Sequence, residues 1–295
     1  MRNDFFILKI FPADMRFRFE MHNYLTIDVE DYFHVAAFAD IVSSNDWDQM
    51  DQRVQVSIAS ILQVLKKHNV KAMFFVVGWV AEKHPDIVRA IIKDGHDIGC
   101  HSYWHCKIYD MTPESFREDT IRAKAVLEKI SNKKITAYRA PSYSITKKSL
   151  WALDILKEAG FTTDSSVFPI AHDLYGIPGA PRFHFTWPDN GIEEYPISTA
   201  LFFGRRIPVA GGGYFRLFPY WFTKMALRRI NNRDRQPFVF YLHPWEIDDK
   251  QPRFSHARWF SRFRHYNNLG KTMDRFERLL NDFAFVPLPA NSGEK

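Results

Sequence analysis

Two histidines four residues apart, His101 and His105, are the side chains of this chain best suited to binding a metal ion. Imidazole nitrogens bind zinc and related divalent metals, and two imidazoles with one carboxylate leave positions free for water and substrate. Residues i and i+4 share one face of a helix, and a tight turn can also bring them together. The pair therefore predicts part of a metal site.

Further polar residues lie where apolar runs end. Asp28, Glu30 and Asp31 follow one such run, and His243 follows another. An isolated arginine, Arg139, lies between them in the chain. Residues of these types at strand ends indicate a hydrolase with a single metal ion, a general base and a general acid.

Strands and helices are expected to alternate along the chain, which favours a parallel sheet with helices outside it. Apolar runs predict strands over residues 24–29, 72–77, 97–101, 135–138, 161–164, 192–197, 238–242 and 284–288. Stripes of helical period predict helices over residues 51–68, 80–94, 112–130, 147–159, 219–231 and 271–283. Residues 168–216 are expected to form loops and short strands, with Gly211 to Gly213 as a flexible loop on the substrate side.

Five of the polar residues share one position relative to these strands. Asp28, His101, Arg139, Asp164 and His243 fall at or just after the carboxyl ends. In α/β barrels that end of the strands holds the active site. We therefore predict an α/β fold that is a distorted or incomplete (β/α) barrel.

Three parts of the chain are expected. Residues 1–20 would be an N-terminal extension unlike the rest, with Met21 as an alternative start of the protein. Residues 21–250 would form the barrel, and residues 251–295 a C-terminal extension packed on it.

Composition restricts the partners. The chain is 46% hydrophobic and 25% charged, as in globular proteins, so disorder is excluded as the default state. A net charge of +6 favours anionic partners such as an acidic glycan, a lipid-linked phosphate or a membrane face, although a solvated basic surface would have the same charge. No nucleic-acid recognition module accompanies the charge, so nucleic acid is not expected as a partner. The oligomeric state stays open.

Cysteine content and apolar runs bear on the compartment. Cys100 and Cys106 are the only cysteines, which excludes a disulfide scaffold and fits a reducing cytoplasm. No run approaches the roughly 20 apolar residues that span a bilayer. We expect a cytoplasmic protein, with peripheral association at the inner membrane face as a further expectation.

The order of these motifs resembles that of the polysaccharide deacetylases, also called NodB-homology or carbohydrate esterase family 4 enzymes. The family motif Thr-Phe-Asp-Asp-Gly is similar to Thr26-Ile-Asp28-Val-Glu30-Asp31. His-Ser/Thr-x-x-His is matched by His101-Ser-Tyr-Trp-His105, and Arg-x-Pro-x-Tyr by Arg139-Ala-Pro-Ser-Tyr143. Weaker matches are Asp164-Ser-Ser and Leu242-His243.

The resemblance extends over residues 24–244 and is strongest for the second and third motifs. The segments Asp28-Val-Glu-Asp-Tyr-Phe and Arg264-His-Tyr-Asn-Asn-Leu look most like the exosortase-associated exopolysaccharide deacetylase subgroup. A barrel of the NodB-homology type with a C-terminal extension is the fold that this implies.

For the mechanism, the resemblance implies metal-assisted hydrolysis of an acetamide. A divalent ion, zinc first and cobalt, nickel or manganese as alternatives, would be held by His101, His105 and an acidic residue. Asp28 would be the general base and His243 the general acid.

Supporting roles are implied for three more residues. Arg139 would keep Asp28 ionised, and Asp164 would position His243. A backbone N–H near Tyr143 would stabilise the oxyanion. Simpler structural roles remain open: a strand-end histidine at His243, an ion-pair partner at Arg139 and a turn cap at Asp164.

One position departs from the family pattern. The residue after the catalytic aspartate is usually a metal-binding aspartate, but here it is Val29. Glu30 or Asp31 must then bind the metal. Glu30 shares a strand face with Asp28, which favours Glu30.

The expected function is metal-dependent N-deacetylation of N-acetylhexosamine units in a polysaccharide or its lipid-linked precursor, within exopolysaccharide biosynthesis. One alternative is an amidohydrolase of the same fold that acts on a small non-sugar amide. The other is an inactive glycan-binding module, which requires that the altered acidic triplet fails to bind metal.

Overall fold

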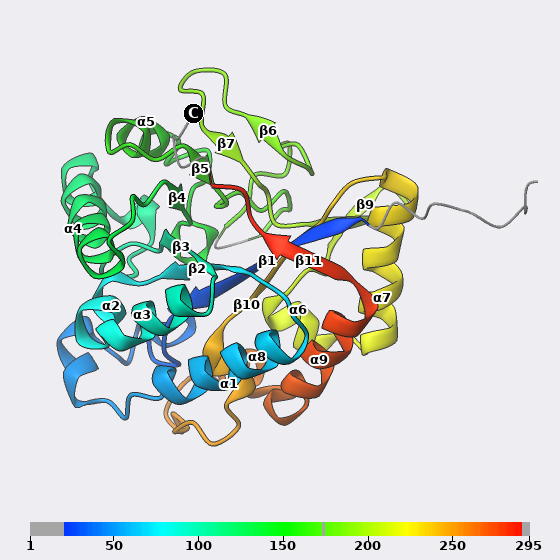
Figure 1. Ribbon diagram of the computed structural model, residues 1–295, viewed down its shortest axis with the longest axis horizontal. Helices are drawn as coiled ribbons and strands as arrows, with labels where there is room; N and C mark the ends of the chain where they lie inside the picture. The colour runs from blue at the N-terminus through cyan, green and yellow to red at the C-terminus, as the bar shows by residue number, and fades with distance from the viewer. Residues whose placement is uncertain (1–20, 173–174, 291–295) are drawn as a thin grey trace, which may run out of the picture.

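The computed structural model describes residues 21–172 and 175–290. Within these residues, a curled sheet has the strand order β10-β1-β2-β3-β4-β5-β7-β6, and β11 also pairs with β1 (Figure 1). Its strands are β1 His22–Val29, β2 Met73–Val76, β3 Asp97–Cys100, β4 Ala137–Tyr138, β5 Thr163–Asp164, β6 Phe185–Thr186, β7 Glu193–Glu194, β10 Val239–Leu242 and β11 Ala284–Pro287. A separate hairpin joins β8 Thr199–Phe202 to β9 Arg205–Pro208.

The strand pairs of the curled sheet are parallel except for the antiparallel pair of β6 and β7. β10 and β6 lie at opposite ends of the strand order, so the sheet is an open, incomplete barrel. The predicted fold class is confirmed. Ile27 on β1 pairs with Leu242 on β10, and Val29 pairs with Val76 on β2, so the residues that follow these strands emerge together.

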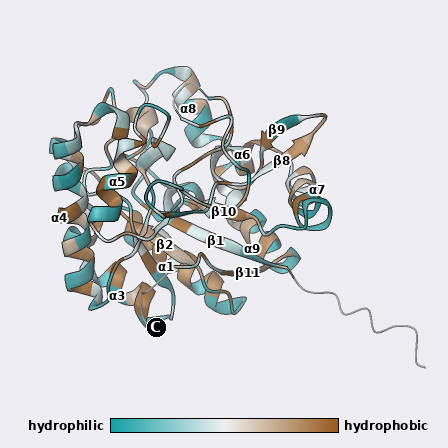
Figure 2. Cartoon of the chain, turned by 90° about the horizontal axis from the view of Figure 1, so that it is seen from above, coloured by the Kyte–Doolittle hydropathy of each residue, from teal (hydrophilic) through white to brown (hydrophobic). Residues whose placement is uncertain are grey.

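Amphipathic helices cover the outside of the sheet. They are α1 Val54–Lys67, α2 Gly78–Lys83, α3 Pro85–Lys93, α4 Pro113–Ser131, α5 Trp151–Glu158, α6 Gly212–Leu217, α7 Tyr220–Arg229, α8 Trp259–Tyr266 and α9 Thr272–Asp282. Their hydrophobic and hydrophilic stretches alternate along the ribbon (Figure 2). In α1 the residues Ile58, Ile61 and Leu65 repeat at helical spacing and are buried in the core. None of the helices in the described part of the chain is long and apolar enough to cross a membrane.

Two local predictions are wrong. The helix expected over residues 80–94 is two helices, α2 and α3, because Pro85 lacks an N–H and restricts the backbone of His84, whose φ is −128° and ψ is 62°. Gly212 and Gly213, expected in a flexible loop, begin α6.

The ends of the chain differ in what the structure describes. The expected extension over residues 1–20, and with it the alternative start at Met21, depends on residues outside the described ones. In the expected C-terminal extension, β11 is a strand of the main sheet and pairs in parallel with β1. The helices α8 and α9 precede it.

Candidate active site

Most of the predicted site residues line one cavity of about 170 Å³ at the carboxyl ends of the strands. Among its lining residues are Asp28, Glu30, His101, His105, Tyr143 and His243. The parallel sheet explains this convergence, because residues far apart in sequence leave neighbouring strands at the same edge. Arg139 and Asp164 lie behind the cavity and do not line it.

Glu30, His101 and His105 form a group with metal-ligand geometry. One ligand atom from each lies within 4.8 Å of the other two. Nδ1 of His101 donates a hydrogen bond to the carbonyl oxygen of Arg139 at 2.7 Å, which leaves the lone pair of Nε2 available. This is the tautomer that a metal-binding histidine needs.

Only one of the two oxygens of the Glu30 carboxylate accepts a hydrogen bond. Its Oε1 accepts the indole N–H of Trp245 at 2.9 Å. Its Oε2 is buried and lies 2.6 Å from Nε2 of His105, yet it accepts no hydrogen bond. Two atoms that bind the same metal ion lie close together without a hydrogen bond between them, and Nε2 of His105 and Oε2 of Glu30 have this arrangement. The donor set therefore fits a divalent cation with nitrogen and oxygen ligands, as zinc has in hydrolases.

Neighbouring histidines also affect the charge of Glu30. Burial acts to raise the pKa of Glu30, but the charges of His105 and His243 outweigh it and hold the pKa well below its usual range. For His101, burial lowers the pKa to about 4. An ionised carboxylate beside a neutral imidazole is the state in which both bind a metal.

Asp31, the alternative metal ligand, is engaged elsewhere. Its Oδ2 accepts the backbone N–H groups of Arg53 and Val54 at 2.7 and 2.9 Å, and its Oδ1 accepts that of Tyr32 at 2.9 Å. The bonds from Arg53 and Val54 cap the amino end of α1, where N–H groups lack partners within the helix. Glu30, and not Asp31, lies in the metal-ligand group.

A buried carboxylate holds the turn that carries the two histidines. The turn is not helical, and Ser102 and His105 have left-handed φ angles of 65° and 53°. Asp119 on α4 accepts hydrogen bonds from Oγ of Ser102 at 2.7 Å and from the N–H groups of Tyr103 and Trp104 at 2.8 and 2.9 Å. Sequence reasoning missed Asp119.

A signal for Asp119 was present in the sequence. Phe116, Ala123 and Leu127 form the buried stripe of α4, and Asp119 lies within it at helical spacing. A charged residue inside an apolar stripe must find a polar partner, so it points to a structural or functional contact.

Arg139 holds Asp28 in a fully buried network. Nη1 of Arg139 donates to Oδ1 of Asp28 at 2.6 Å and to Oγ1 of Thr26 at 2.7 Å. Nε and Nη2 donate to the backbone oxygen and the hydroxyl of Ser165 at 3.0 and 2.7 Å. Burial acts to lower the pKa of Arg139, but the charge of Asp28 outweighs it and raises the pKa. Arg139 and Asp28 are thus in direct contact, and the catalytic role expected for Arg139 stays a prediction.

The second oxygen of Asp28 faces the cavity. Oδ2 lies 3.8 Å from Nε2 of His243, and the hydroxyl of Tyr143 donates to it over 3.5 Å. The backbone N–H of Tyr143 itself donates to the carbonyl oxygen of Ala140 at 3.1 Å. The oxyanion role expected for an N–H near Tyr143 therefore stays a prediction.

Glu246, not Asp164, positions His243, so the expected role of Asp164 is wrong. Nδ1 of His243 donates to Oε1 of Glu246 at 2.6 Å, while Nε2 lies 3.7 Å from Oε1 of Glu30. Arg216 donates from Nε to Oε2 of Glu246 at 2.6 Å. Burial acts to lower the pKa of His243, but Glu30 and Glu246 raise it to about 9.

Asp164 belongs to a different buried cluster, behind Arg139. Its Oδ1 accepts the hydroxyl of Ser166 at 2.5 Å. Glu194 is its acidic neighbour, and burial together with the charge of Asp164 raises the pKa of Glu194 well above its usual range. Asp164 comes from β5, and the residue that follows it, Ser165, contacts Arg139, so its link to the cavity is indirect.

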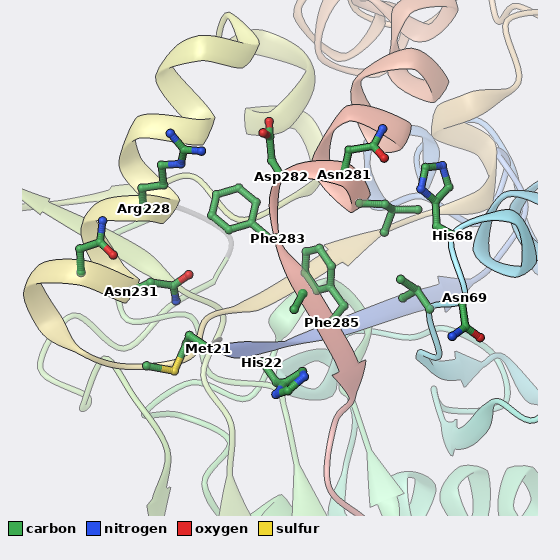
Figure 3. A pocket seen from close by; sticks show the side chains of 14 residues that line it. Met21, His22, His68, Asn69, Arg228, Asn231, Asn281, Asp282, Phe283 and Phe285 are labelled. Atoms are coloured by element: carbon green, nitrogen blue, oxygen red, sulfur yellow. The ribbon is translucent and has the colours of Figure 1, made fainter. Parts of the chain in front are cut away.

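A larger cavity, of about 840 Å³, lies at the other end of β1 (Figure 3). It is lined by polar side chains such as His22, Asn69, Asn231 and Asp282, with Phe283 and Phe285. None of the predicted site residues lines it. Among the described residues, the single group of three with metal-ligand spacing is that of Glu30, His101 and His105, so the chemistry is placed at the smaller cavity.

Comparisons with known proteins divide the chain into two matched segments. Residues 46–163 match the family model described as Polysaccharide deacetylase. Residues 165–290 match one described as Domain of unknown function (DUF3473). His101, His105 and Arg139 lie in the first segment and His243 in the second, while Asp28 and Glu30 precede both.

A curated relative is a peptidoglycan-N-acetylglucosamine deacetylase from Bacillus cereus, 37% identical over 147 residues, which cover 45% of this chain and 52% of that protein. The chain thus spans about half the length of that relative.

Solved structures share the fold at low identity. A crystal structure from Mycobacterium smegmatis, assigned as a polysaccharide deacetylase, has a TM-score of 0.56 at 18% identity, covering 90% of this chain and 88% of that one. The allantoinase Puue has a TM-score of 0.55 at 13% identity, covering 89% of this chain and 85% of that one. At such identities these likenesses show the fold alone.

Proposed function

We propose that this chain is a polysaccharide deacetylase, which hydrolyses the N-acetyl groups of N-acetylhexosamine units in a polysaccharide or its lipid-linked precursor. The observation that carries the proposal is the group of Glu30, His101 and His105 in one cavity with Asp28 and His243. This arrangement offers three metal ligands, a carboxylate base and an imidazole acid within reach of one substrate atom.

Glu30, His101 and His105 would hold a divalent cation, for which zinc is the first choice. When bound, the ion would polarise the acetamide carbonyl and acidify a water molecule. The support comes from the free lone pair on Nε2 of His101 and from the buried Oε2 of Glu30, which has no hydrogen-bond donor.

Asp28 would take the proton of the attacking water. Arg139 donates to Oδ1 of Asp28, so Oδ2, which lies 3.8 Å from Nε2 of His243, remains directed to the cavity as the basic atom. The water oxygen forms a bond to the acetyl carbon, and the bond from that carbon to the sugar nitrogen breaks.

His243 would donate a proton from Nε2 to the departing sugar nitrogen, so acetate and a free amine leave the site. Glu246 holds Nδ1 and fixes the direction of the ring. The indole of Trp245 stacks on the ring of His243 at 5.2 Å between centroids, and it also binds Glu30, so one side chain orients the acid and a metal ligand together.

Within this proposal the substrate belongs to exopolysaccharide biosynthesis, and the protein acts in the cytoplasm or at the inner membrane face. The resemblance of Asp28-Val-Glu-Asp-Tyr-Phe and Arg264-His-Tyr-Asn-Asn-Leu to the exosortase-associated exopolysaccharide deacetylase subgroup supports the first part. The net charge of +6 supports attraction to an anionic glycan or membrane.

Acetate release from N-acetylglucosamine oligomers, together with elemental analysis of the purified protein, tests the proposal. We expect a bound divalent metal, acetate release, and loss of release in Asp28→Asn with the metal retained. Metal without acetate release from any N-acetylated glycan would favour the small-amide hydrolase. Glycan binding without metal or acetate release would favour the inactive binding module.

A further inference from the structure

A second cavity, of about 320 Å³, continues from the catalytic cavity along α6 and α8. Tyr241 belongs to the walls of both. Its ring lies 5.1 Å from that of Tyr143 and 5.4 Å from that of His243, measured between centroids, so it borders the catalytic residues directly. A ligand that fills the second cavity would therefore extend from the first.

Three consecutive glycines create this shared wall. At Gly211 a Cβ atom would lie 2.0 Å from the backbone oxygen of Tyr241, and at Gly212 it would lie 2.3 Å from the Tyr241 hydroxyl. Both glycines also have left-handed φ angles, of 128° and 55°. Glycine lets the start of α6 approach Tyr241 closely, and this approach brings Tyr214 and Leu217 to the cavity.

The opposite wall comes from α8, which lies beside α6 (Figure 2). Phe260 and Phe263 line the cavity although they are 53% and 44% exposed, and Leu217 across from them is 49% exposed. Apolar side chains of this size in contact with solvent carry a cost that a bound ligand would remove. The cavity has the volume of a small-ligand site, for which about 300–1,000 Å³ is usual.

Polar groups lie at one edge of these rings. Arg264 and Asn267 line the same cavity. The guanidinium of Arg264 lies 4.1 Å from the centre of the Phe260 ring, a cation–π contact that fixes its direction. Aromatic rings beside hydrogen-bond donors suit a sugar ring, whose C–H face is apolar and whose edge carries hydroxyl groups.

We propose that the cavity between α6 and α8 is a second sugar subsite, which binds a unit of the same polysaccharide chain beside the unit that is deacetylated. The inference rests on the proposed function and deepens it: the substrate is a polymer, bound over several units. The side chains that build the subsite lie outside residues 46–163, the segment that matches the deacetylase family, so the subsite is a feature of the second matched segment.

A membrane surface is the competing occupant of α8. Its most exposed ring is Trp259, at 74%, which does not line the cavity. A membrane contact would depend most on Trp259, whereas a sugar subsite depends on Phe263 and Leu217. Substitution of Trp259 and of Phe263, two aromatic residues on the same helix, therefore distinguishes a membrane contact from a sugar subsite.

The experiment measures acetate release from N-acetylglucosamine oligomers of increasing length by the full chain. For the wild type we expect kcat/KM to rise from short to long oligomers. Phe263→Ala and Leu217→Ala should lower kcat/KM for the long oligomers by about three- to tenfold, the size of one lost stacking contact, and change it less than about twofold for the shortest. Trp259→Ala should lower kcat/KM less than Phe263→Ala does, because the Trp259 ring stacks on that of Phe263 at 5.8 Å between centroids but does not itself line the cavity.

An equal loss for short and long oligomers in Phe263→Ala, or a loss in Trp259→Ala as large, would overturn the subsite. The subsite would also be overturned by a second combination of results: the wild type sediments with phosphatidylglycerol vesicles, Trp259→Ala does not, and Phe263→Ala leaves oligomer hydrolysis unchanged. Calorimetric binding of the longest oligomer separates the two proposals. Binding that depends on Phe263 without acetate release would support the subsite and refute the deacetylase function. Acetate release without length dependence would refute the subsite alone.

Discussion

Oε1 of Glu246 lies 2.6 Å from Nδ1 of His243, and the same oxygen accepts the backbone N–H of His243 at 3.1 Å. Burial acts to raise the pKa of Glu246, but Arg216 and His243 outweigh it and lower the pKa. An ionised carboxylate bound in this way fixes the direction of the imidazole and stabilises its protonated form, which a general acid requires.

Glu246→Gln should therefore lower kcat for acetate release by about a hundredfold with little change in KM, because the acid loses both its charge partner and its fixed direction. Steady-state kinetics on an N-acetylglucosamine oligomer measure this. Glu194→Gln is the matched control, since Glu194 is equally buried but belongs to the Asp164 cluster. Equal losses in the two variants would mean that Glu246 acts only through stability.

Substitutions of the two adjacent acidic residues just after β1, Glu30 and Asp31, should separate metal binding from stability. Glu30→Gln should lose the tightly bound metal, because an amide is a poor ligand for a divalent cation in place of a carboxylate. Asp31→Asn should retain the metal and lower the free energy of unfolding by about 1 kcal/mol, because the cap of α1 is weakened. Elemental analysis and urea unfolding of both proteins give the two readouts. Metal loss in Asp31→Asn alone would reverse the assignment.

Asp119→Asn should weaken metal binding without removing a ligand. Asp119 holds the turn between His101 and His105 through three hydrogen bonds, and an amide can accept fewer of them. We expect about a tenfold loss in zinc affinity, the lower end for residues that orient metal ligands, and recovery of kcat at excess zinc. Glu118→Gln, an exposed neighbour on α4, should leave the affinity unchanged. An unchanged affinity in Asp119→Asn would show that the turn holds its shape without this carboxylate.

His96 should make folding sensitive to acid independently of the active site. It is buried, its Nδ1 accepts the N–H of Ala72 at 3.2 Å, and burial lowers its pKa to about 4. The unfolded chain binds a proton near the ordinary value of about 6.5, so the contribution to stability is present above that pH and is lost as pH falls from about 6.5 to about 4.

When the pH is lowered from 7 to 5, protonation linked to His96 should decrease the free energy of unfolding of the wild type by about 2 kcal/mol. Urea unfolding at the two pH values should show a smaller decrease in His96→Gln and an unchanged one in the exposed control His256→Gln. The same decrease in all three proteins would assign the acid sensitivity to other groups.

The part of the site that follows from the parallel sheet could be predicted from the sequence. Asp28, His101 and His243 were expected to meet because each lies at or just after the carboxyl end of a strand in one parallel sheet, and their cavity has this origin. The sequence favoured Glu30 over Asp31 on the expectation that side chains alternate beyond Asp28. Glu30 lies just after the end of β1, and its place in the metal-ligand group agrees with that preference.

Contacts that depend on local turns were not predictable in the same way. Pro244 begins a short 3-10 turn that brings Glu246 back to His243, and no apolar pattern marks that turn. The family pattern pointed to Asp164 instead. The helix α8 was not among the predicted helices, although Trp259 and Phe263 lie four residues apart on one face of it. Both rings are exposed, so this stripe does not pack into the core.

In the proposed mechanism, hydrolysis requires a single divalent ion held by Glu30, His101 and His105. Titration of zinc into the metal-stripped protein, with acetate release followed at each addition, tests it most directly. We predict that activity returns in proportion to zinc until a single ion is bound per chain, and that His105→Ala neither binds this ion tightly nor recovers activity. Full activity of the stripped protein would show that hydrolysis does not require the ion. Unchanged tight binding and recovery in His105→Ala would show that His105 does not hold it.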